Sequence, residues 1–567
     1  VINDLMNIKG YTRTQAQNLV YSGGLKIYTT QDQHIQSILD EEYANPENYP
    51  ENVQYALDYA LTVTNPQGEE VNYSKEMLSL YFQNEDPEFD LLFDSQEEAQ
   101  AYVDRYKQSV LADGSKVVAE RVNFAPQPQS SMSVIDQHTG YVKAIVGGRG
   151  EKTASLTLNR ATDTTRQPGS TFKVVSTYAP ALNEKGMTLA TTFEDEPYNY
   201  PDGSPVENAS RTYGGTTTIR RAIQNSINVV AVKCLEEVTP ELGLQYLDNF
   251  GFTTLAHGTE ADTDANGTVW TDANLPLALG GLTHGVTNVE LCAAYAAIAN
   301  QGNYIEPLYY TKILDHNGNV LIEKTSAERS VIKESTAWLL TSAMEDVVKS
   351  GTGTACQLDN MTVAGKTGTT DDYNDLWFVG YTPYYTCAVW SGFDNNEKLP
   401  DDYSRDFHKD MWRKVMTRIH EGLEDKDFEM PSTVEKISVC ADTGLLPRSG
   451  CSVITEFFDV GDVPTDYCEE HFYEPEPVIP EYTYDETIIP EPSLTPENPD
   501  ENGDQGDGNT DNGDAGGEGN GGDDTGSGDT GGGDTGDGDT GGGDVGGGDT
   551  DGGDTGGGDA GGGEIIE

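Results

Sequence analysis

Apolar and polar residues alternate in several short stretches of the chain, and these stretches predict β-strands. Residues 132–136 and 141–146 show this alternation on either side of a turn that contains a glycine, which indicates a β-hairpin. Three more strands are predicted over residues 361–366, 376–381 and 385–390, the last two joined at Thr382-Pro383. The strands lie in two groups, one on each side of a long central region.

Helical periodicity fills much of the remaining chain. A helix is predicted over residues 31–44, where the apolar positions share one face. Helices are also predicted over residues 55–61 and 96–107, inside a mixed and acidic region. Residues 187–300 have a mostly helical pattern. Strands on both sides of a helical region predict an α+β fold, in which an antiparallel sheet is flanked by helices and accompanied by a helical lobe.

One predicted helix begins with a pair of reactive residue types. Pro168-Gly169 ends the preceding segment, and Ser170 opens an apolar run that continues to about Gly186. Pro180 is expected to kink this helix or to restart it. Ser170 and Lys173 share one helix face, which is an arrangement suited to a nucleophile and its base.

The position of Lys173 is unusual for an ordinary helix start. A capping box has Glu or Gln three residues after the cap, whereas this chain has a lysine there. A cation at the positive end of the helix dipole is unfavourable, so the site favours the neutral amine that a base requires. Taken alone, Ser-x-x-Lys is still more often a simple helix cap.

Two further motifs follow in order, Ser226-Ile227-Asn228 and Lys366-Thr367-Gly368. Ser-x-x-Lys followed by Lys-Thr-Gly is the signature of penicillin-binding proteins and class A β-lactamases. The flanking text adds Asn159-Arg160-Ala161, Ala278-Leu279-Gly280-Gly281, Gly365 to Thr370 and Trp377 to Pro383. With these segments the chain resembles the class A (bifunctional) penicillin-binding proteins over roughly residues 1–400.

The resemblance implies the penicillin-binding-protein/serine β-lactamase-like fold and a division of the chain into parts. Residues 1–30 would end an interdomain linker, 31–128 would form a linker or pedestal region, and 129–425 would form the transpeptidase domain. A cysteine-containing extension would cover residues 426–477. The remaining residues, 478–567, are rich first in Pro and Glu and then in Gly, Asp and Thr, and are predicted to be disordered.

The resemblance also implies the catalytic roles. Ser170 would be the nucleophile and Lys173 its base, with Ser226 bridging the lysines and passing a proton to the leaving amine. Lys366 would supply a positive field for a carboxylate. The Ser170 and Thr369 N–H groups are expected to form the oxyanion hole. None of the eight histidines falls within these motifs, so a Ser-His-Asp triad is unsupported.

Substrate binding is predicted at four positions. Asn228 would hold the substrate amide, and Thr367 and Thr369 would bind a terminal carboxylate. Gly368 would let the backbone approach the substrate closely. The strand that carries Thr367, Gly368 and Thr369 is expected at a sheet edge, where an extended peptide can pair with it.

The implied function is that of a peptidoglycan D,D-transpeptidase, which cross-links stem peptides ending in D-Ala-D-Ala and is acylated by β-lactam antibiotics. The alternatives are a D,D-carboxypeptidase or serine β-lactamase, or a non-catalytic β-lactam sensor. A class A β-lactamase would have Ser-Asp-Asn where this chain has Ser226-Ile227-Asn228, and it would need a glutamate base for deacylation that the sequence does not reveal.

The same resemblance places the chain on the extracytoplasmic face of the bacterial membrane. It implies an anchoring helix and a glycosyltransferase domain upstream of Val1, as a partner in the same chain. The chain itself has no signal peptide and no apolar run of 18 residues, which suggests an excised or processed piece.

Charge and cysteine content add two constraints. The formal net charge is −62, which argues against nucleic acid as a partner. Of seven cysteines, Cys440, Cys451 and Cys468 cluster near the end of the predicted folded part. A disulfide within this trio is the favoured interpretation, and a zinc site that adds His471 is its rival, although the spacing is not that of common zinc modules. No metal or cofactor is predicted for the reaction.

Overall fold

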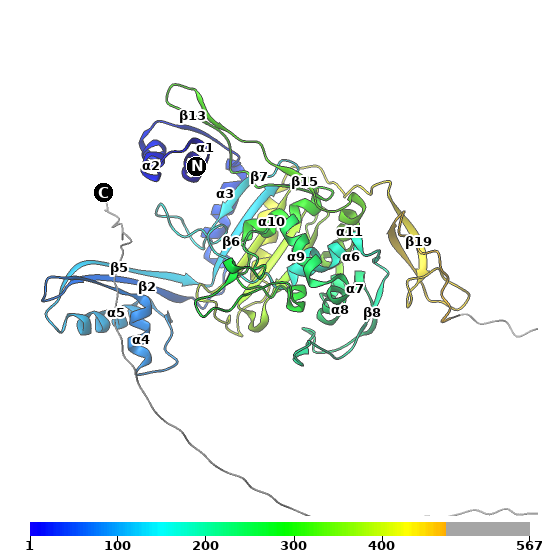
Figure 1. The fold of residues 1–567 in the computed structure, drawn as a ribbon, viewed down its shortest axis with the longest axis horizontal. Helices are drawn as coiled ribbons and strands as arrows, with labels where there is room; N and C mark the ends of the chain where they lie inside the picture. Colours follow the sequence, from blue (N-terminus) through cyan, green and yellow to red (C-terminus); the bar gives the residue numbers. More distant parts are fainter. Residues whose placement is uncertain (472–567) are drawn as a thin grey trace, which may run out of the picture. The chain divides into compact units, whose positions relative to one another are not determined.

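The computed structural model describes residues 1–471, so the predicted tail (478–567) lies outside the described residues. The centre of the described part is a five-stranded antiparallel sheet (Figure 1). In spatial order the strands are β16 (Ala364–Thr369), β17 (Asp375–Tyr381), β18 (Thr386–Gly392), β6 (Gln129–Asp136) and β7 (Tyr141–Val146). The predicted antiparallel sheet is therefore confirmed, and the Lys-Thr-Gly strand β16 lies at its edge as expected.

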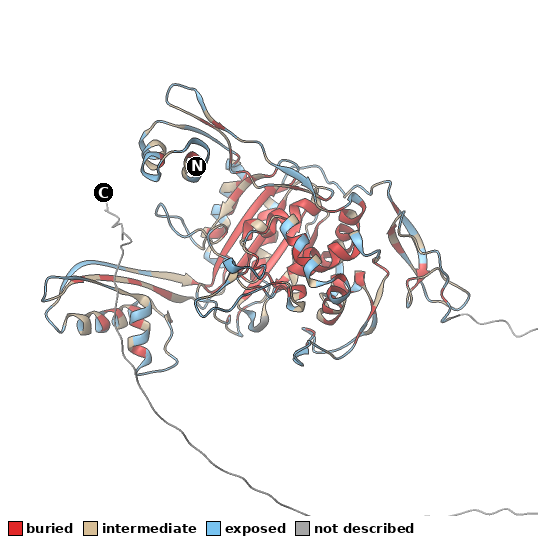
Figure 2. Ribbon diagram, viewed as in Figure 1, coloured by how far each residue is buried: buried red, intermediate tan, exposed pale blue. Residues whose placement is uncertain are grey.

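The two faces of this sheet bury different side chains, because successive residues of a strand point to opposite sides. Trp377 and Val379 pack into the core of the helical lobe, whereas Leu376 and Phe378 pack on the other face. Helices cover both faces, so both sets of side chains are buried, and Figure 2 shows the buried residues concentrated in this sheet and the helices around it.

The helices divide between the two faces. One face contacts α3 (Gln33–Ala44) and α12 (Phe407–Ile419). The other contacts α10 (Asn288–Ala299) and α11 (Glu334–Ser350). The predicted helix over residues 31–44 thus corresponds to α3, and its four expected apolar residues are all buried.

The helical lobe lies between the two groups of strands in sequence. Its helices are η2 (Gly169–Thr171), η3 (Lys173–Tyr178), α6 (Ala179–Glu184), α7 (Ile219–Asn225), α8 (Asn228–Val238), α9 (Pro240–Asn249) and two short 3₁₀ turns, η4 (Glu260–Asp262) and η5 (Leu275–Leu279). Small two-stranded sheets join it: β8 (Thr192–Asp195) with β11 (Gly215–Thr218), β9 (Tyr198–Asn199) with β10 (Pro205–Val206), and β12 (Asn303–Ile305) with β15 (Glu328–Ser330).

The region before the central sheet has its own core. The long strands β2 (Gln54–Thr64) and β5 (Lys116–Gln127) pair along their lengths, with β3 (Glu70–Ser74), β4 (Leu92–Phe93), α4 (Lys75–Gln83) and α5 (Gln96–Leu111) beside them. The helix predicted over residues 96–107 is confirmed as part of α5.

The helix predicted over residues 55–61 is wrong, because this stretch belongs to strand β2. Its Ala and Leu residues favour a helix locally. However, Leu57, Tyr59, Leu61 and Val63 are buried at every second position, which is the period of a strand. Pairing with β5 along the whole strand outweighs the local helix preference.

The chain begins and ends in smaller units. At the start, α1 (Ile2–Lys9) and α2 (Arg13–Ser22) pack on a three-stranded sheet of β1 (Lys26–Thr29), β13 (Tyr310–Leu314) and β14 (Val320–Glu323). At the end of the described part, β19 (Val434–Cys440) and β20 (Val453–Asp459) form a hairpin. Within residues 1–471, no helix combines the length and the apolar character that crossing a bilayer requires.

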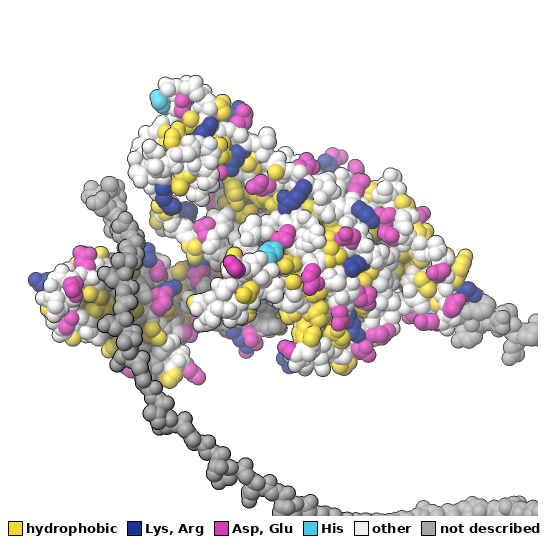
Figure 3. All heavy atoms as spheres, in the orientation of Figure 1, with side chains coloured by type: hydrophobic (Ala, Val, Ile, Leu, Met, Phe, Trp, Pro, Cys, Tyr) yellow, Lys and Arg dark blue, Asp and Glu magenta, His cyan; other side chains and the backbone are white. Residues whose placement is uncertain are grey.

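Acidic side chains are spread over the surface. On the face shown in Figure 3 they are scattered over the described part of the molecule, with lysines and arginines between them. The whole sequence has 96 Asp and Glu against 34 Lys and Arg.

Candidate active site

Ser170 opens into a surface cavity of about 510 Å³. It lies in the short 3₁₀ turn η2, directly after Gly169, whose φ of +54° requires the left-handed region that glycine tolerates. Asn228 and Thr369 line the same cavity. Three of the sequence-predicted site residues therefore face one hollow, although they come from three distant parts of the chain.

Lys173 begins a π-helical turn, η3, rather than a regular α-helix. Pro180 follows this turn in α6 and has no N–H to donate to the carbonyl of Ser176. The preceding N–H, that of Ala179, bonds to the carbonyl of Val174 five residues back. Pro180 was predicted to kink the helix or to restart it, and α6 does begin beside it, at Ala179. A π-helical turn of this kind is often found at functional sites.

The amine of Lys173 is fully buried and held by three oxygen atoms. Its Nζ lies 2.6 Å from the carbonyl oxygen of Ser226, 3.2 Å from Ser226 Oγ and 2.6 Å from Asn228 Oδ1. No ion pair joins Lys173 to a carboxylate within the described part of the chain. The amine is thus fixed in position next to the serine turn without a neutralising charge.

Ser226 connects the two lysines. Its hydroxyl lies 3.2 Å from Lys173 Nζ and 2.8 Å from Lys366 Nζ. The residue sits between α7 and α8 with a φ of +56°, a left-handed conformation that is uncommon for a serine. The structure therefore brings together Lys173, Ser226 and Lys366, as the order of motifs predicted.

Burial alters the basicity of both amines. The pKa of Lys173 is well below its usual value because the amine is desolvated and because Lys366 is close. Burial lowers the pKa of Lys366 to about 7. Since the charge of Lys366 further disfavours a charge on Lys173, we expect Lys173 to be the first of the two to lose its proton as the pH rises.

Strand β16 approaches the serine turn very closely. A methyl group at Gly169 would lie 2.7 Å from the carbonyl oxygen of Thr369, and one at Gly368 would lie 2.5 Å from that of Pro168. Only residues without a side chain allow this contact. The backbone of Thr369 is thereby brought beside the turn that carries Ser170, as an oxyanion hole built from these two residues requires.

Not all predicted residues face the cavity. Lys173, Ser226 and Lys366 form the hydrogen-bonded cluster next to its wall rather than part of its lining. The hydroxyl of Thr367 lies 2.7 Å from that of Thr352. Gly368 does not line the cavity. It allows strand β16 to pack closely on the turn that carries Ser170.

An ion pair holds the segment before the serine. Arg166 Nε lies 2.9 Å from Asp375 Oδ1, and both side chains are buried. The indole N–H of Trp390 donates to the same carboxylate oxygen at 2.8 Å. Two backbone hydrogen bonds also join Arg166 to Val286. These contacts attach the approach to Ser170 to strands β17 and β18.

Sequence reasoning missed several residues that shape the site. Asn208 accepts a hydrogen bond from the backbone N–H of Asn228 at 3.0 Å and so helps to place that side chain. Trp270 and Tyr200 line the cavity, and Thr352 contacts the strand beside it. No short motif contains these residues, so no local signal identifies them.

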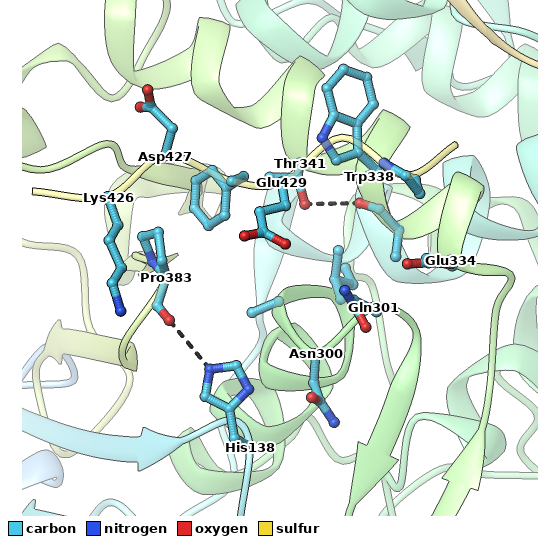
Figure 4. Close-up of a pocket in the computed structure, with 15 residues that line it drawn as sticks. His138, Asn300, Gln301, Glu334, Trp338, Thr341, Pro383, Lys426, Asp427 and Glu429 are labelled. Atoms are coloured by element: carbon cyan, nitrogen blue, oxygen red, sulfur yellow. Dashed lines mark hydrogen bonds between the residues drawn. The ribbon is translucent and has the colours of Figure 1, made fainter. Parts of the chain in front are cut away.

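A second cavity, of about 360 Å³, lies apart from these residues (Figure 4). His138, Trp338, Lys426 and Glu429 line it, and His138 Nε2 lies 3.2 Å from the carbonyl oxygen of Pro383. None of the sequence-predicted site residues contributes to its wall. The first cavity, which contains Ser170, is therefore the candidate active site.

Comparison with known families agrees with this assignment of regions. The family described as "Penicillin binding protein transpeptidase domain" matches residues 131–417. The family described as "Penicillin-binding protein 1A, C-terminal domain" matches residues 430–473. The first match covers the central sheet and the helical lobe, and the second covers the hairpin β19–β20.

Individual relatives give the same result. A protein of Clostridium botulinum named "Penicillin-binding protein 1A" is 34% identical over 382 residues, which is 64% of this chain and 44% of that protein. The chain thus spans less than half the length of that relative. Among solved structures, penicillin-binding protein 1A from Haemophilus influenzae superposes with a TM-score of 0.57 and 19% identity, covering 82% of this chain and 76% of that one. The PonA1 protein of Mycobacterium tuberculosis in complex with penicillin V gives a TM-score of 0.53 and 20% identity, covering 76% of this chain and 94% of that one.

Proposed function

The chain belongs to the penicillin-binding protein transpeptidase family, and we propose that it is a peptidoglycan D,D-transpeptidase whose nucleophile is Ser170. One observation carries the proposal. Ser170 faces a cavity next to a buried cluster in which Ser226 contacts the amines of both Lys173 and Lys366. Such a cluster supplies a base, a proton relay and a positive charge beside one hydroxyl.

Acylation of Ser170 is the first half of the proposed reaction. Neutral Lys173 takes the hydroxyl proton as Ser170 Oγ attacks the carbonyl carbon of the D-Ala-D-Ala amide. The N–H groups of Ser170 and Thr369 stabilise the oxyanion that forms. The C–N bond then breaks, and the leaving D-alanine takes a proton through Ser226. The product is an ester between Ser170 and the shortened peptide.

Deacylation reverses the proton transfers with a second peptide. Its amine loses a proton to the base, attacks the ester carbonyl and releases Ser170, so that a new amide bond joins two stem peptides. A β-lactam acylates Ser170 in the same way, but the nitrogen that leaves the carbonyl stays attached through the opened ring. The leaving group therefore remains in the site, where it obstructs deacylation.

Carboxylate recognition completes the proposal. Lys366 and Thr369 lie beside the cavity at the edge strand β16, where an extended peptide can add to the sheet. Asn228 is already oriented by Lys173 and by the carbonyl of Glu207, 2.6 Å from its Nδ2, so its position is set before the substrate binds.

The cavity lining argues against a class A β-lactamase. A β-lactamase of class A needs a glutamate to activate the deacylating water. Among the described residues, the carboxylates that line the cavity are Asp272 and Asp375. Asp272 accepts hydrogen bonds from Ala256 and Thr283, and Asp375 pairs with Arg166, so both support the fold rather than a water molecule.

The wider context follows the family and stays a prediction. We infer an extracytoplasmic location, with β-lactams and peptidoglycan stem peptides as ligands. The glycosyltransferase domain and membrane anchor predicted upstream belong to the same inference.

The experiment that tests the function supplies both donor and acceptor. The purified chain is incubated with a synthetic peptide ending in D-Ala-D-Ala and an amine acceptor, and the products are identified by mass spectrometry. The expected result is release of D-alanine together with a product that contains the acceptor. Hydrolysed peptide alone would instead indicate a carboxypeptidase. Neither product, with a stable penicillin adduct, would indicate a sensor.

A pH profile tests the proposed protonation states. The rate constant for acylation by a penicillin is expected to rise as Lys173 becomes neutral and to fall as Lys366 loses its charge, whose pKa is about 7. The rate constant rises and then falls with pH because the base must be unprotonated and the carboxylate-binding group must be protonated. The second-order rate constant reports the free enzyme, so it should be measured well below saturation. A rate that keeps rising far above pH 7 would exclude Lys366 as the group that must stay charged.

A further inference from the structure

The C-terminal hairpin carries a cluster of metal-binding side chains that the proposed reaction does not use. Cys440 ends strand β19, Cys451 lies just before β20, and Cys468 and His471 come from the segment after β20. One ligand atom from each of the four lies within 4.8 Å of all the others. Residues far apart in sequence thus converge on one point.

The sulfur atoms are not paired with one another. All seven cysteines of the chain are free in the structure, so the disulfide favoured within the trio is contradicted. Sulfur atoms in a disulfide are about 2.0 Å apart, and a paired arrangement would leave the third thiol and His471 without a common partner. Here all four groups share one centre instead.

The distances from His471 Nδ1 to two of the sulfur atoms match the edges of a tetrahedral zinc site. His471 Nδ1 lies 3.5 Å from Cys440 Sγ and 3.3 Å from Cys468 Sγ. Zinc binds sulfur at about 2.3 Å and imidazole nitrogen at about 2.0–2.1 Å, so tetrahedral angles place such ligand pairs about 3.6 Å apart. The cluster is therefore already arranged as ligands around a single ion.

The surroundings orient the ligands. His471 turns Nδ1 toward the sulfur atoms, and its Nε2 lies 3.5 Å from Asp442 Oδ2. A carboxylate on the far nitrogen is the common way to fix the tautomer of a metal-binding histidine. The backbone N–H of Arg448 donates to Cys451 Sγ at 3.3 Å and so fixes the position of that sulfur.

Backbone hydrogen bonds hold the ligand segments side by side. Gly444, with a φ of +70°, turns the chain after Cys440, and its N–H bonds to the carbonyl of Cys440 at 2.9 Å. The N–H of Cys468 bonds to the carbonyl of Leu446 at 2.8 Å. The turn and the later segment are thus joined directly, and both Cys440 and Cys468 are buried.

The hairpin strands pack on the main core through Val434 and Phe457, but the hairpin's own hydrophobic cluster is small. Its hydrophobic cluster contains three buried residues, Val439, Phe458 and Ala190, the last of which comes from the helical lobe. A unit this small buries too little apolar surface to be stable alone and needs a disulfide, a metal or contacts with a larger domain. Two hydrogen bonds from Arg220 of α7 to Glu456, at 2.6 and 2.7 Å, connect strand β20 to the helical lobe. They do not reach the loop end of the hairpin, which is the loop between β19 and β20 that contains Cys451.

We propose that Cys440, Cys451, Cys468 and His471 bind one Zn²⁺ ion that holds the loop end of this hairpin together. Three thiolates and one imidazole form a soft, closed ligand set of the kind that zinc occupies in structural sites. Four protein ligands leave no open position for a substrate, so the site is structural.

Metal content is the first test. The full chain, purified under reducing conditions, is incubated with zinc, desalted and analysed by elemental mass spectrometry, and one zinc ion per chain is expected. Cys451→Ser and His471→Ala should each lose most of this zinc. These two residues are partly exposed, so the substitutions leave the buried core in place. Cys356→Ala, which removes a buried thiol outside the cluster, should keep one ion and is the matched control.

Two measurements on the unmodified chain keep the proposal testable if a variant does not fold. Cobalt in place of zinc should give the intense visible absorption of a tetrahedral thiolate site. After denaturation with a chelator, all seven cysteines should react with a thiol reagent. A chain that binds no zinc or cobalt, or one that has two thiols fewer and a disulfide within the trio, would overturn the proposal.

Discussion

Ser170→Ala is expected to abolish labelling of the chain by a fluorescent penicillin while leaving the fold intact. The substitution removes the only atom that can form the proposed acyl bond, and loss of the nucleophile in a serine acyl-transfer enzyme costs on the order of 10⁶ in turnover. Ser170 is half-buried at the cavity wall, so an alanine fits without rearrangement. Labelling is measured on a denaturing gel, and folding by circular dichroism.

A matched control separates this effect from handling losses. Ser37→Ala changes an exposed serine of α3, whose hydroxyl bonds only to the backbone of its own helix, and should label like the unmodified chain. Undiminished labelling of Ser170→Ala would refute the assignment of the nucleophile. In that case the acceptor of the drug would be another group.

Lys173→Met is expected to lower the rate of acylation by about 10²–10⁴, the usual contribution of a general base. Methionine keeps much of the length and the apolar body of the side chain but has no amine. It leaves Asn228 Oδ1 and the carbonyl of Ser226 without their present donor, so the variant should also be less stable. The rate is followed by stopped-flow or quenched labelling at several penicillin concentrations.

The pH profile distinguishes loss of the base from a general distortion of the site. The residual rate of Lys173→Met should lack the rising limb that the unmodified chain shows, whereas distortion alone would lower the rate and keep the limb. Lys349→Met, in an exposed position on α11, is the matched control and should not change the rate. An unchanged rate in Lys173→Met would mean that a different group accepts the proton.

Local patterns predicted the central part of the fold. All five strands of the main sheet were predicted, but the helices on both faces bury every residue of β17 and β18, which an alternation of apolar and polar positions does not indicate. Helix α3 was likewise predictable, because its buried residues all lie on one face. The helix predicted over residues 55–61 was wrong because pairing between β2 and β5 outweighs the local preference for a helix.

The sequence predicted only those site residues that belong to short motifs. The motifs identified Ser170, Lys173, Ser226 and Lys366, and the structure brings the last three into one hydrogen-bonded cluster beside the turn that carries the first. Asn208 and Thr352 were missed because each lies outside the motif that it contacts, 20 and 15 residues before Asn228 and Thr367. The π-helical turn at Lys173 also had no signal except Pro180 after it.

The cysteine cluster shows why spacing alone was a poor guide. Its ligands come from a strand end, a loop and a later segment, so the intervals between them do not match those of compact zinc modules. The turn at Gly444 and the backbone pairing of Leu446 with Cys468 bring them together, and neither follows from the separation of the cysteines.

The most direct test of the central claim is to incubate the purified chain with a penicillin, follow its intact mass over time, and map the modified peptide. The account predicts one adduct per chain, stable for many minutes and located on Ser170. Rapid loss of the drug with no adduct, or an adduct on any other residue, would contradict it.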